Sequence, residues 1–296
     1  MTSSRAHSPL IPWCFLAPFL LIFTTFTTWP LIRSLVLAFE QSFGPKTTAF
    51  VGFLNFRFMM SDPMFWTAVG NTALFTVCAV CLQIPVALAL ALLLNRPDIR
   101  GKRTFRLIFF APSIVGLSFV AILFSLLLER RVGLINSSLH ALFPAWDPDF
   151  PWLQGFVLTS MSGAILWLSA GFYMIYFLAA LQNVPGELLE AASMDGAGPW
   201  QRFRHITLPE IRPVLNLITL LVIIGSLQFF ELPFLVYNDT AGSGPDNRAL
   251  TIVTYLYQTG FHSGDLGYAS AIGWVLTLVL IGFALLQRVI ARRSER

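Results

Sequence analysis

Six long stretches of this 296-residue chain contain no charged residue. They cover residues 8–32, 68–94, 107–128, 155–181, 214–230 and 266–287. A helix that crosses a bilayer needs about 20 apolar residues, because it rises about 1.5 Å per residue through a hydrocarbon core about 30 Å thick. Every stretch reaches that length except 214–230, which does so when it is extended through Glu231 to Tyr237. The pattern predicts an all-α polytopic membrane protein with six transmembrane helices.

The composition argues against a water-soluble fold. Charged residues make up 11% of the chain and the mean hydropathy is +0.71, whereas soluble domains carry roughly a quarter charged residues. An outer-membrane barrel does not fit either, because its strands need only about 10 alternating residues. The first stretch follows Arg5 and is open to a second interpretation as a cleavable signal peptide. The apolar region of such a peptide is usually only about 7 to 15 residues long, so we predict a retained span.

The lysine and arginine residues are unevenly distributed between the loops. Of the 19 in the chain, 13 lie in the N-terminal tail, residues 95–106, residues 182–213 and the C-terminal tail. Cytoplasmic loops of membrane proteins carry the excess of positive charge. We therefore expect a multi-pass protein with both termini in the cytoplasm and with the 182–213 loop on the same side.

The 182–213 loop contains signals for a short helix. Pro185 pre-sets a helical φ angle, and Glu187 and Glu190 are expected in the first turn, where the helix dipole favours anions. Gly196 can adopt the left-handed conformation that ends a helix. A second short helix is expected from Pro199 to Ile206, broken by the Leu208-Pro209 pair that follows.

The same loop carries a motif. From Glu190 it reads EAASMDGAGPWQRFRHITLP, with Glu-Ala-Ala, then Gly196 after three residues, then Ile-x-Leu-Pro after nine more. This spacing resembles the cytoplasmic EAA loop of the membrane subunits of binding-protein-dependent ABC importers. The resemblance implies the type I importer permease fold and a loop, residues 187–209, that docks in a cleft of a cytoplasmic ATPase. The alternative is a solvated connector that happens to be helical.

The implied docking residues include two small ones that leave the helix surface nearly bare, so that another protein can approach the backbone. They are Glu187, Glu190, Ala191, Ala192, Asp195 and Gly196. On this resemblance we divide the chain into an N-terminal helix with an extracytoplasmic segment (1–66), a transporter transmembrane domain (67–290) and a cytoplasmic tail (291–296).

Other segments are similar to the sugar-type permeases of the family, such as those for maltose and glycerol phosphate. They are residues 51–56, 62–66, 71–72, 244–245, 249–251, 255–261 and 266–271. The resemblance implies import of a sugar or related polyol across a bacterial inner membrane. The implied partners are a second permease subunit, an ABC ATPase dimer and an extracytoplasmic binding protein. An ABC permease for a non-sugar solute stays open as the alternative.

No site for ATP, a metal or another cofactor is expected. The only Gly-Lys pair, Gly101-Lys102, has Arg96 where a phosphate-binding loop needs glycine. ATP hydrolysis must then come from a partner subunit, and we do not expect an enzyme or a catalytic residue. The four histidines are isolated, and Cys78 and Cys81 lie with Cys14 inside predicted spans, where we interpret the cysteines as packing residues.

Two groups of residues are candidates for substrate contact. Gln228 and Glu231 are spaced one helical turn apart, and a carboxylate inside a bilayer is treated as functional by default. The alternative for Glu231 is that it reaches the outer surface. Trp167 and Phe172 resemble sugar-stacking aromatics of the maltose importer's permease, although packing is the commoner role of a membrane aromatic. Other polar positions of that site are apolar here, namely Ile165, Leu221 and Gly225.

Two other classes of membrane protein are weaker candidates. A secondary transporter or channel should carry several ionisable residues within its spans or a selectivity constriction, and here Glu231 alone qualifies. A membrane-embedded enzyme would need paired catalytic groups, which the stretches lack.

Overall fold

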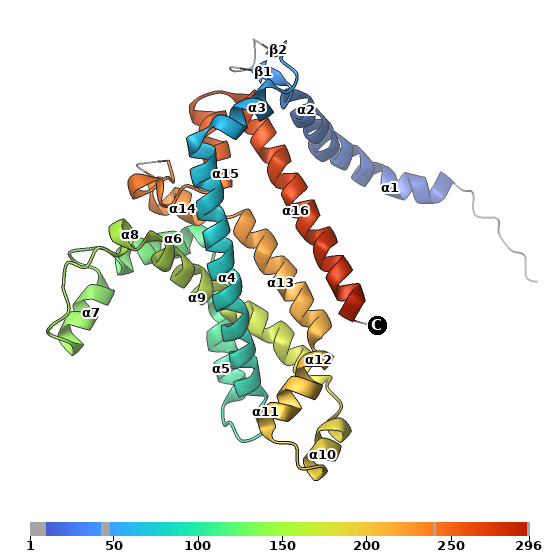
Figure 1. Ribbon diagram of the computed structural model, residues 1–296, viewed down its shortest axis with the longest axis vertical. Helices are drawn as coiled ribbons and strands as arrows, with labels where there is room; N and C mark the ends of the chain where they lie inside the picture. Colours follow the sequence, from blue (N-terminus) through green and yellow to red (C-terminus); the bar gives the residue numbers. More distant parts are fainter. Residues whose placement is uncertain (1–9, 43–47, 239–240, 295–296) are drawn as a thin grey trace, which may run out of the picture. The chain divides into compact units, whose positions relative to one another are not determined.

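The computed structural model describes residues 10–42, 48–238 and 241–294 (Figure 1). Its contacts divide the chain into two units, which we describe separately. Unit 1 comprises residues 1–62 and 256–275, and unit 2 comprises residues 63–255 and 276–296. The predicted division after residue 66 stays a prediction.

Unit 1 holds helices α1 and α2, strands β1 and β2, and helix α3. Their bounds are α1 Leu10–Phe23, α2 Trp29–Leu37, β1 Glu40–Ser42, β2 Thr48–Phe50 and α3 Leu54–Ser61. A π-helical turn, Thr24–Thr28, joins α1 to α2. Residues Phe15–Leu37 are together long and apolar enough to cross a membrane, which confirms the first predicted span.

Helices α4 to α14 belong to unit 2, and α15 and α16 contribute residues to both units. Their bounds are α4 Pro63–Asn95, α5 Lys102–Phe110, α6 Leu117–Leu127, α7 Leu134–Leu142, α8 Trp152–Gly155, α9 Val157–Gln182, α10 Gly186–Met194, α11 Pro199–Arg202, α12 Leu208–Glu210, α13 Arg212–Leu227, α14 Glu231–Val236, α15 Ile252–Tyr257 and α16 Leu266–Ser294.

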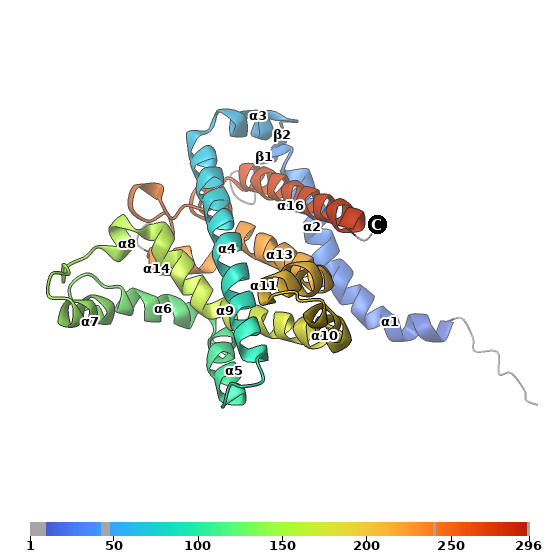
Figure 2. The same ribbon diagram turned by 60° about the horizontal axis from the view of Figure 1, so that its bottom comes forward.

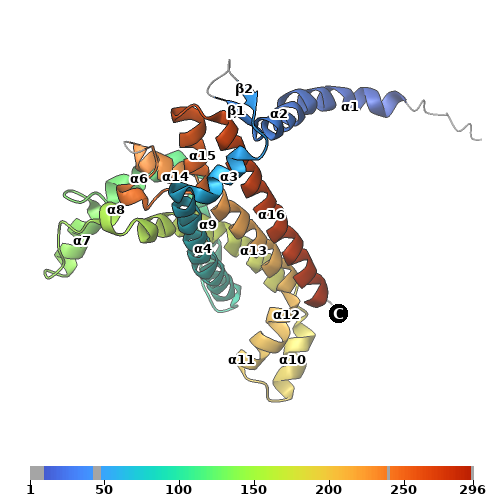
Figure 3. The same cartoon turned by 45° about the horizontal axis from the view of Figure 1, so that its top comes forward.

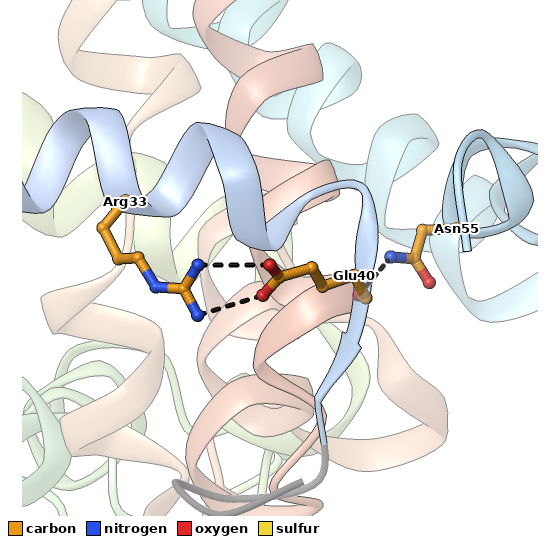
Figure 4. A network of polar contacts seen from close by, with 3 residues as sticks. All are labelled: Arg33, Glu40 and Asn55. Carbon is orange, nitrogen blue, oxygen red and sulfur yellow. Dashed lines mark hydrogen bonds and ion pairs between the residues drawn. The ribbon is translucent and has the colours of Figure 1, made fainter. Parts of the chain in front are cut away.

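Polar contacts fix the turn after α2 in unit 1 (Figure 4). The Arg33 guanidinium forms an ion pair with the Glu40 carboxylate, with a distance of 3.0 Å between Nη2 and Oε2. The Asn55 side-chain amide donates to the backbone carbonyls of Ala38 and Glu40, each at 3.0 Å. The β1–β2 hairpin and α3 lie next to this turn (Figure 3). At the start of α16, Gly267 packs directly against the Glu40 carbonyl, so one turn connects α2, β1, α3 and α16.

The core of unit 2 forms where α4, α9 and α13 pack together (Figure 1). Small residues on α4 let the helices approach closely, and larger residues from α9 and α13 fill the space between them. The buried residues include Ala79, Ala87, Ala91, Met174, Phe177, Ile218 and Val222. Cys78 and Cys81 lie on α4 as free thiols.

The third apolar stretch is not a straight helix. Helix α5 ends at Phe110, a 3₁₀ turn follows, and α6 leaves at 100° to α5 (Figure 2). Pro112 lacks a backbone N–H, and the extended residue Val115 (φ −75°, ψ 133°) ends the turn. Five helices of the described chain are long and apolar enough to span a membrane, and the predicted number of six is reached when this bent pair counts as one span.

A compact polar cluster orders the segment between α6 and α8. The Asn136 side chain donates to the carbonyls of Arg130 and Phe150 and accepts a bond of 2.8 Å from the Trp152 indole. The backbone N–H groups of Val132 and Arg131 donate to the Glu129 carboxylate at 2.7 Å, and these bonds lower the pKa of Glu129.

Candidate functional site

Helix α10 forms in the predicted place. It begins after Pro185, whose φ of −61° suits the entry to a helix, and Gly196 follows its end with a φ of +80°. The Ala197 N–H donates to the Ala192 carbonyl and the Gly196 N–H to the Ser193 carbonyl. This pair of bonds is a Schellman motif, which needs a residue in the left-handed conformation at the position of Gly196.

Two details of the loop differ from prediction. Glu187 lies in the first turn of α10, but Glu190 lies one turn further along, because the helix starts at Gly186. The chain does not break at Leu208-Pro209 either. A π-helical turn, Phe203–Thr207, leads without a gap from α11 into α12, which contains Pro209. Ile211 (ψ 0°) separates α12 from α13.

The α10–α11 pair lies at one end of unit 2, beyond the C-terminal end of α9 (Figure 3). Five of the implied docking residues are exposed and Ala192 is half-buried. The sequence interpretation missed exposed apolar side chains on the same surface, namely Met194 (90% exposed) and Trp200 (68% exposed). Trp200 packs against Phe203 at a ring-centroid distance of 5.5 Å. Exposed apolar side chains on a connecting loop are typical of a protein–protein interface. The signal available in the sequence was the presence of these apolar residues within a charged loop.

A cavity of about 550 Å³ lies in unit 2, lined by residues of α4, α6, α9, α13, α14 and α15 and of the connection between α13 and α14. The lining residues are Phe75, Gln83, Leu117, Ile165, Leu168, Ser169, Tyr173, Val222, Gly225, Ser226, Gln228, Phe229, Phe230, Glu231 and Val253. The rings of Phe75 and Phe229 stack with centroids 4.1 Å apart. The cavity therefore combines flat apolar surfaces with a few polar groups, as small-molecule sites generally do.

Two of the four predicted substrate contacts line the cavity, and the other two do not. Gln228 and Glu231 both line the cavity, but not as neighbours on one helix, because α13 ends at Leu227 and α14 begins at Glu231. Trp167 and Phe172 are not among the lining residues. Trp167 packs against Phe124, and Phe172 packs against Tyr173 and Tyr176.

Polar lining residues that the sequence interpretation missed come from α4 and α9. The Ser169 hydroxyl lies 2.9 Å from the Gln83 Oε1, and Tyr173 follows one turn later on α9. Gln83 is an amide in the middle of an apolar stretch, and a polar side chain at such a position indicates a functional or packing role within the membrane. Serine is common in membrane helices, so Ser169 gave no such signal, whereas Tyr173 belongs to the same aromatic group of residues 155–181 as Trp167 and Phe172.

The break between α13 and α14 is supported by hydrogen bonds from distant residues. Pro233 has no N–H to donate to the Phe229 carbonyl, and the Thr251 hydroxyl donates to that carbonyl at 2.7 Å instead. The Ile252 N–H donates to the Thr72 hydroxyl on α4 at 3.0 Å. Side chains thus satisfy backbone groups at the break between α13 and α14 and at the start of α15, which is how membrane proteins accommodate irregular backbone.

Comparison with known proteins supports this architecture. The chain is 35% identical to the lactose transport system permease protein LacF of Rhizobium radiobacter, over 99% of this chain and 98% of that protein. It is also 35% identical to the arabinooligosaccharides transport system permease protein AraP of Bacillus subtilis (strain 168), over 93% of this chain and 86% of that protein.

A solved structure is similar over nearly the whole fold. It is a chain of a bacterial ABC transporter involved in the import of the acidic polysaccharide alginate, with a TM-score of 0.82 and 25% identity over 96% of this chain and 95% of that one. The family described as binding-protein-dependent transport system inner membrane component matches residues 83–296. The chain therefore belongs to this family and is a permease subunit of an ABC importer.

Proposed function

We propose that this permease imports a sugar or related polyol that an extracytoplasmic binding protein delivers. The cavity supports the proposal, because its half-buried aromatic lining residues, Tyr173 and Phe230, can contact the apolar sides of a sugar ring. Gln83, Ser169 and Gln228 offer groups that can hydrogen-bond to sugar hydroxyls. The relatives named as permeases for lactose and for arabinooligosaccharides support the same substrate class.

The energy for import comes from a partner ATPase in this proposal. The α10–α11 pair docks on the ATPase through Glu187, Glu190, Asp195 and Gly196 and the alanines between them. Loop residues 95–106 and both termini lie on the same cytoplasmic side. A second permease subunit completes the translocation pathway, and the ATPase dimer drives alternating access between the two permeases.

The observation that carries this mechanism is the short connection from the docking pair to the cavity. Three residues join α9 to α10, and Ile211 alone joins α12 to α13. Helix α9 brings Ser169 and Tyr173 to the cavity, and α13 brings Val222 and Ser226. A displacement of the docking pair therefore acts directly on two cavity-lining helices, which gives the coupling between sites a physical route.

Reconstitution of the purified complex tests the proposal. The chain is purified with its co-expressed partners and placed in proteoliposomes with the binding protein and a panel of neutral and acidic oligosaccharides, polyols, amino acids and inorganic ions. We expect uptake of one of these solutes that requires both ATP and the binding protein. A purified complex without any ATPase would contradict the mechanism, and uptake of an amino acid or an inorganic ion instead would contradict the substrate class.

A further inference from the structure

The cavity lining of the described chain carries a single charged residue, and that residue is acidic. Glu231 is the one acidic residue among the described lining residues, and none of them is lysine, arginine or histidine. The Glu231 side chain is exposed to the cavity, and its carboxylate forms no ion pair or hydrogen bond with any residue of the described chain. No countercharge among the described residues therefore lies beside this carboxylate.

The walls around this carboxylate amplify its effect. They are formed mainly by apolar side chains such as Leu168, Val222 and Phe229 from packed helices. A cleft that is lined by one sign of charge and has walls of low dielectric constant concentrates the field of that charge. Neutral lining amides and hydroxyls can orient toward a sugar, but they do not cancel the charge.

We infer that Glu231 selects the substrate by charge, so that the cavity admits uncharged and amino-bearing sugars and excludes anionic ones such as uronates and sulfonates. This inference rests on the proposed function and narrows its substrate class. The carboxylate accepts hydrogen bonds from hydroxyls or from a protonated amine, whereas an anionic sugar would meet a like charge that no basic lining residue of the described chain offsets.

A thiol placed in the cavity can measure this potential without knowledge of the substrate. Gly225 lines the cavity, and a Cβ atom added there meets no heavy atom within 4 Å, so Gly225→Cys fits the fold. The background carries alanine at Cys14, Cys78 and Cys81. The full importer complex in nanodiscs is treated with two methanethiosulfonates of similar size, the cationic trimethylammonium-ethyl and the anionic sulfonatoethyl reagent. Each rate is normalised to that of a free thiol in solution.

The ratio of the cationic to the anionic rate reports the local charge. We expect Glu231→Gln to lower this ratio by about three- to tenfold at low salt, with a smaller change at high salt because ions screen the carboxylate. Glu231→Asp keeps the charge and should keep the ratio. Asp246→Asn is the matched control, because Asp246 is an exposed carboxylate outside the cavity lining, and it should leave the ratio unchanged.

Two results would overturn the inference. One is a ratio that Glu231→Gln does not change. The other is a Gly225→Cys thiol that neither reagent modifies, because an aqueous ion then does not reach the cavity. The uptake assay in proteoliposomes does not depend on the thiol measurement. Failure of charge selection is therefore distinguishable from failure of the proposed import of sugars.

Discussion

Gly171 shows how strongly a single residue constrains this fold. It lies on α9 where that helix meets α5, and a Cβ atom added there would overlap the backbone carbonyl of Phe109. Backbone atoms of a packed helix cannot move aside as a flexible side chain can. Glycine at this position therefore allows the two helices to touch.

Gly171→Ala should destabilise the protein by about 2 to 3 kcal/mol, in the upper range for overpacking of a tight core. The thermal unfolding temperature of the detergent-purified complex measures the effect. Gly163→Ala on the same helix is the control, because an added Cβ meets nothing within 4 Å there, and helix propensity predicts a gain of about 0.5 to 1 kcal/mol. Equal stability of the two variants would show that α9 and α5 are not in close contact.

Thr251 is a second residue that constrains the fold, through the hydrogen bond that its hydroxyl donates to the Phe229 carbonyl. Thr251→Val should cost about 1 to 3 kcal/mol, because it leaves the Phe229 carbonyl without its donor in a buried place. Thr219→Val is the matched control. The Thr219 hydroxyl donates to the Leu215 carbonyl within a regular helix, where that carbonyl already has a backbone donor. The same unfolding measurement compares the two variants, and a loss at Thr219 as large as that at Thr251 would contradict the proposed support of the break.

At the scale of elements, helix α10, which we propose docks on the ATPase, combines a fixed end with an exposed face. Gly196 has to keep a positive φ for the Schellman motif, and Glu190 is exposed on α10. Gly196→Val or Glu190→Lys should leave the protein in the membrane but uncouple uptake from ATP hydrolysis, because the first distorts the end of the docking surface and the second reverses a charge on it.

The measurement is the number of solute molecules transported per ATP hydrolysed in proteoliposomes. Gly186→Ala serves as the control, since Gly186 has no positive φ and an added Cβ meets nothing within 4 Å. Wild-type coupling in both the Gly196 and the Glu190 variants would remove α10 from the transmission of the ATPase movement.

The elements were largely predictable because each apolar stretch forms its own backbone hydrogen bonds, whatever lies around it. The 107–128 stretch was harder, since Pro112 and Gly116 are both tolerated within membrane helices and do not reveal a 100° bend. The i, i+3 spacing of Gln228 and Glu231 suggested one helix, and the break depends on Thr251, which is distant in the sequence. Trp167 and Phe172 were candidates by resemblance, and their packing depends on neighbours from other helices that a linear pattern does not specify.

At the scale of the whole molecule, the distribution of positive charge predicts one orientation in the membrane. Met194→Cys and Val132→Cys place thiols at residues that are 90% and 78% exposed, in a background without Cys14, Cys78 and Cys81. With the ATPase washed off the vesicles, an impermeant maleimide should label Met194→Cys in inside-out vesicles alone and Val132→Cys in intact spheroplasts alone. The opposite pattern would place the docking loop outside the cell and exclude its contact with an ATPase.

The Asn71 side chain has a consequence for the order in which the protein is made. Its amide nitrogen on α4 donates to the backbone carbonyls of Asn247 and Leu250, at 2.7 and 3.0 Å, across almost 180 residues of chain. A ribosome adds residues one at a time and early segments organise first, so these two bonds form only after the last sixth of the polypeptide has begun to emerge. Nascent chains that stop before Asn247 thus lack both hydrogen bonds from the Asn71 amide, which distinguishes an incomplete product from a mature one.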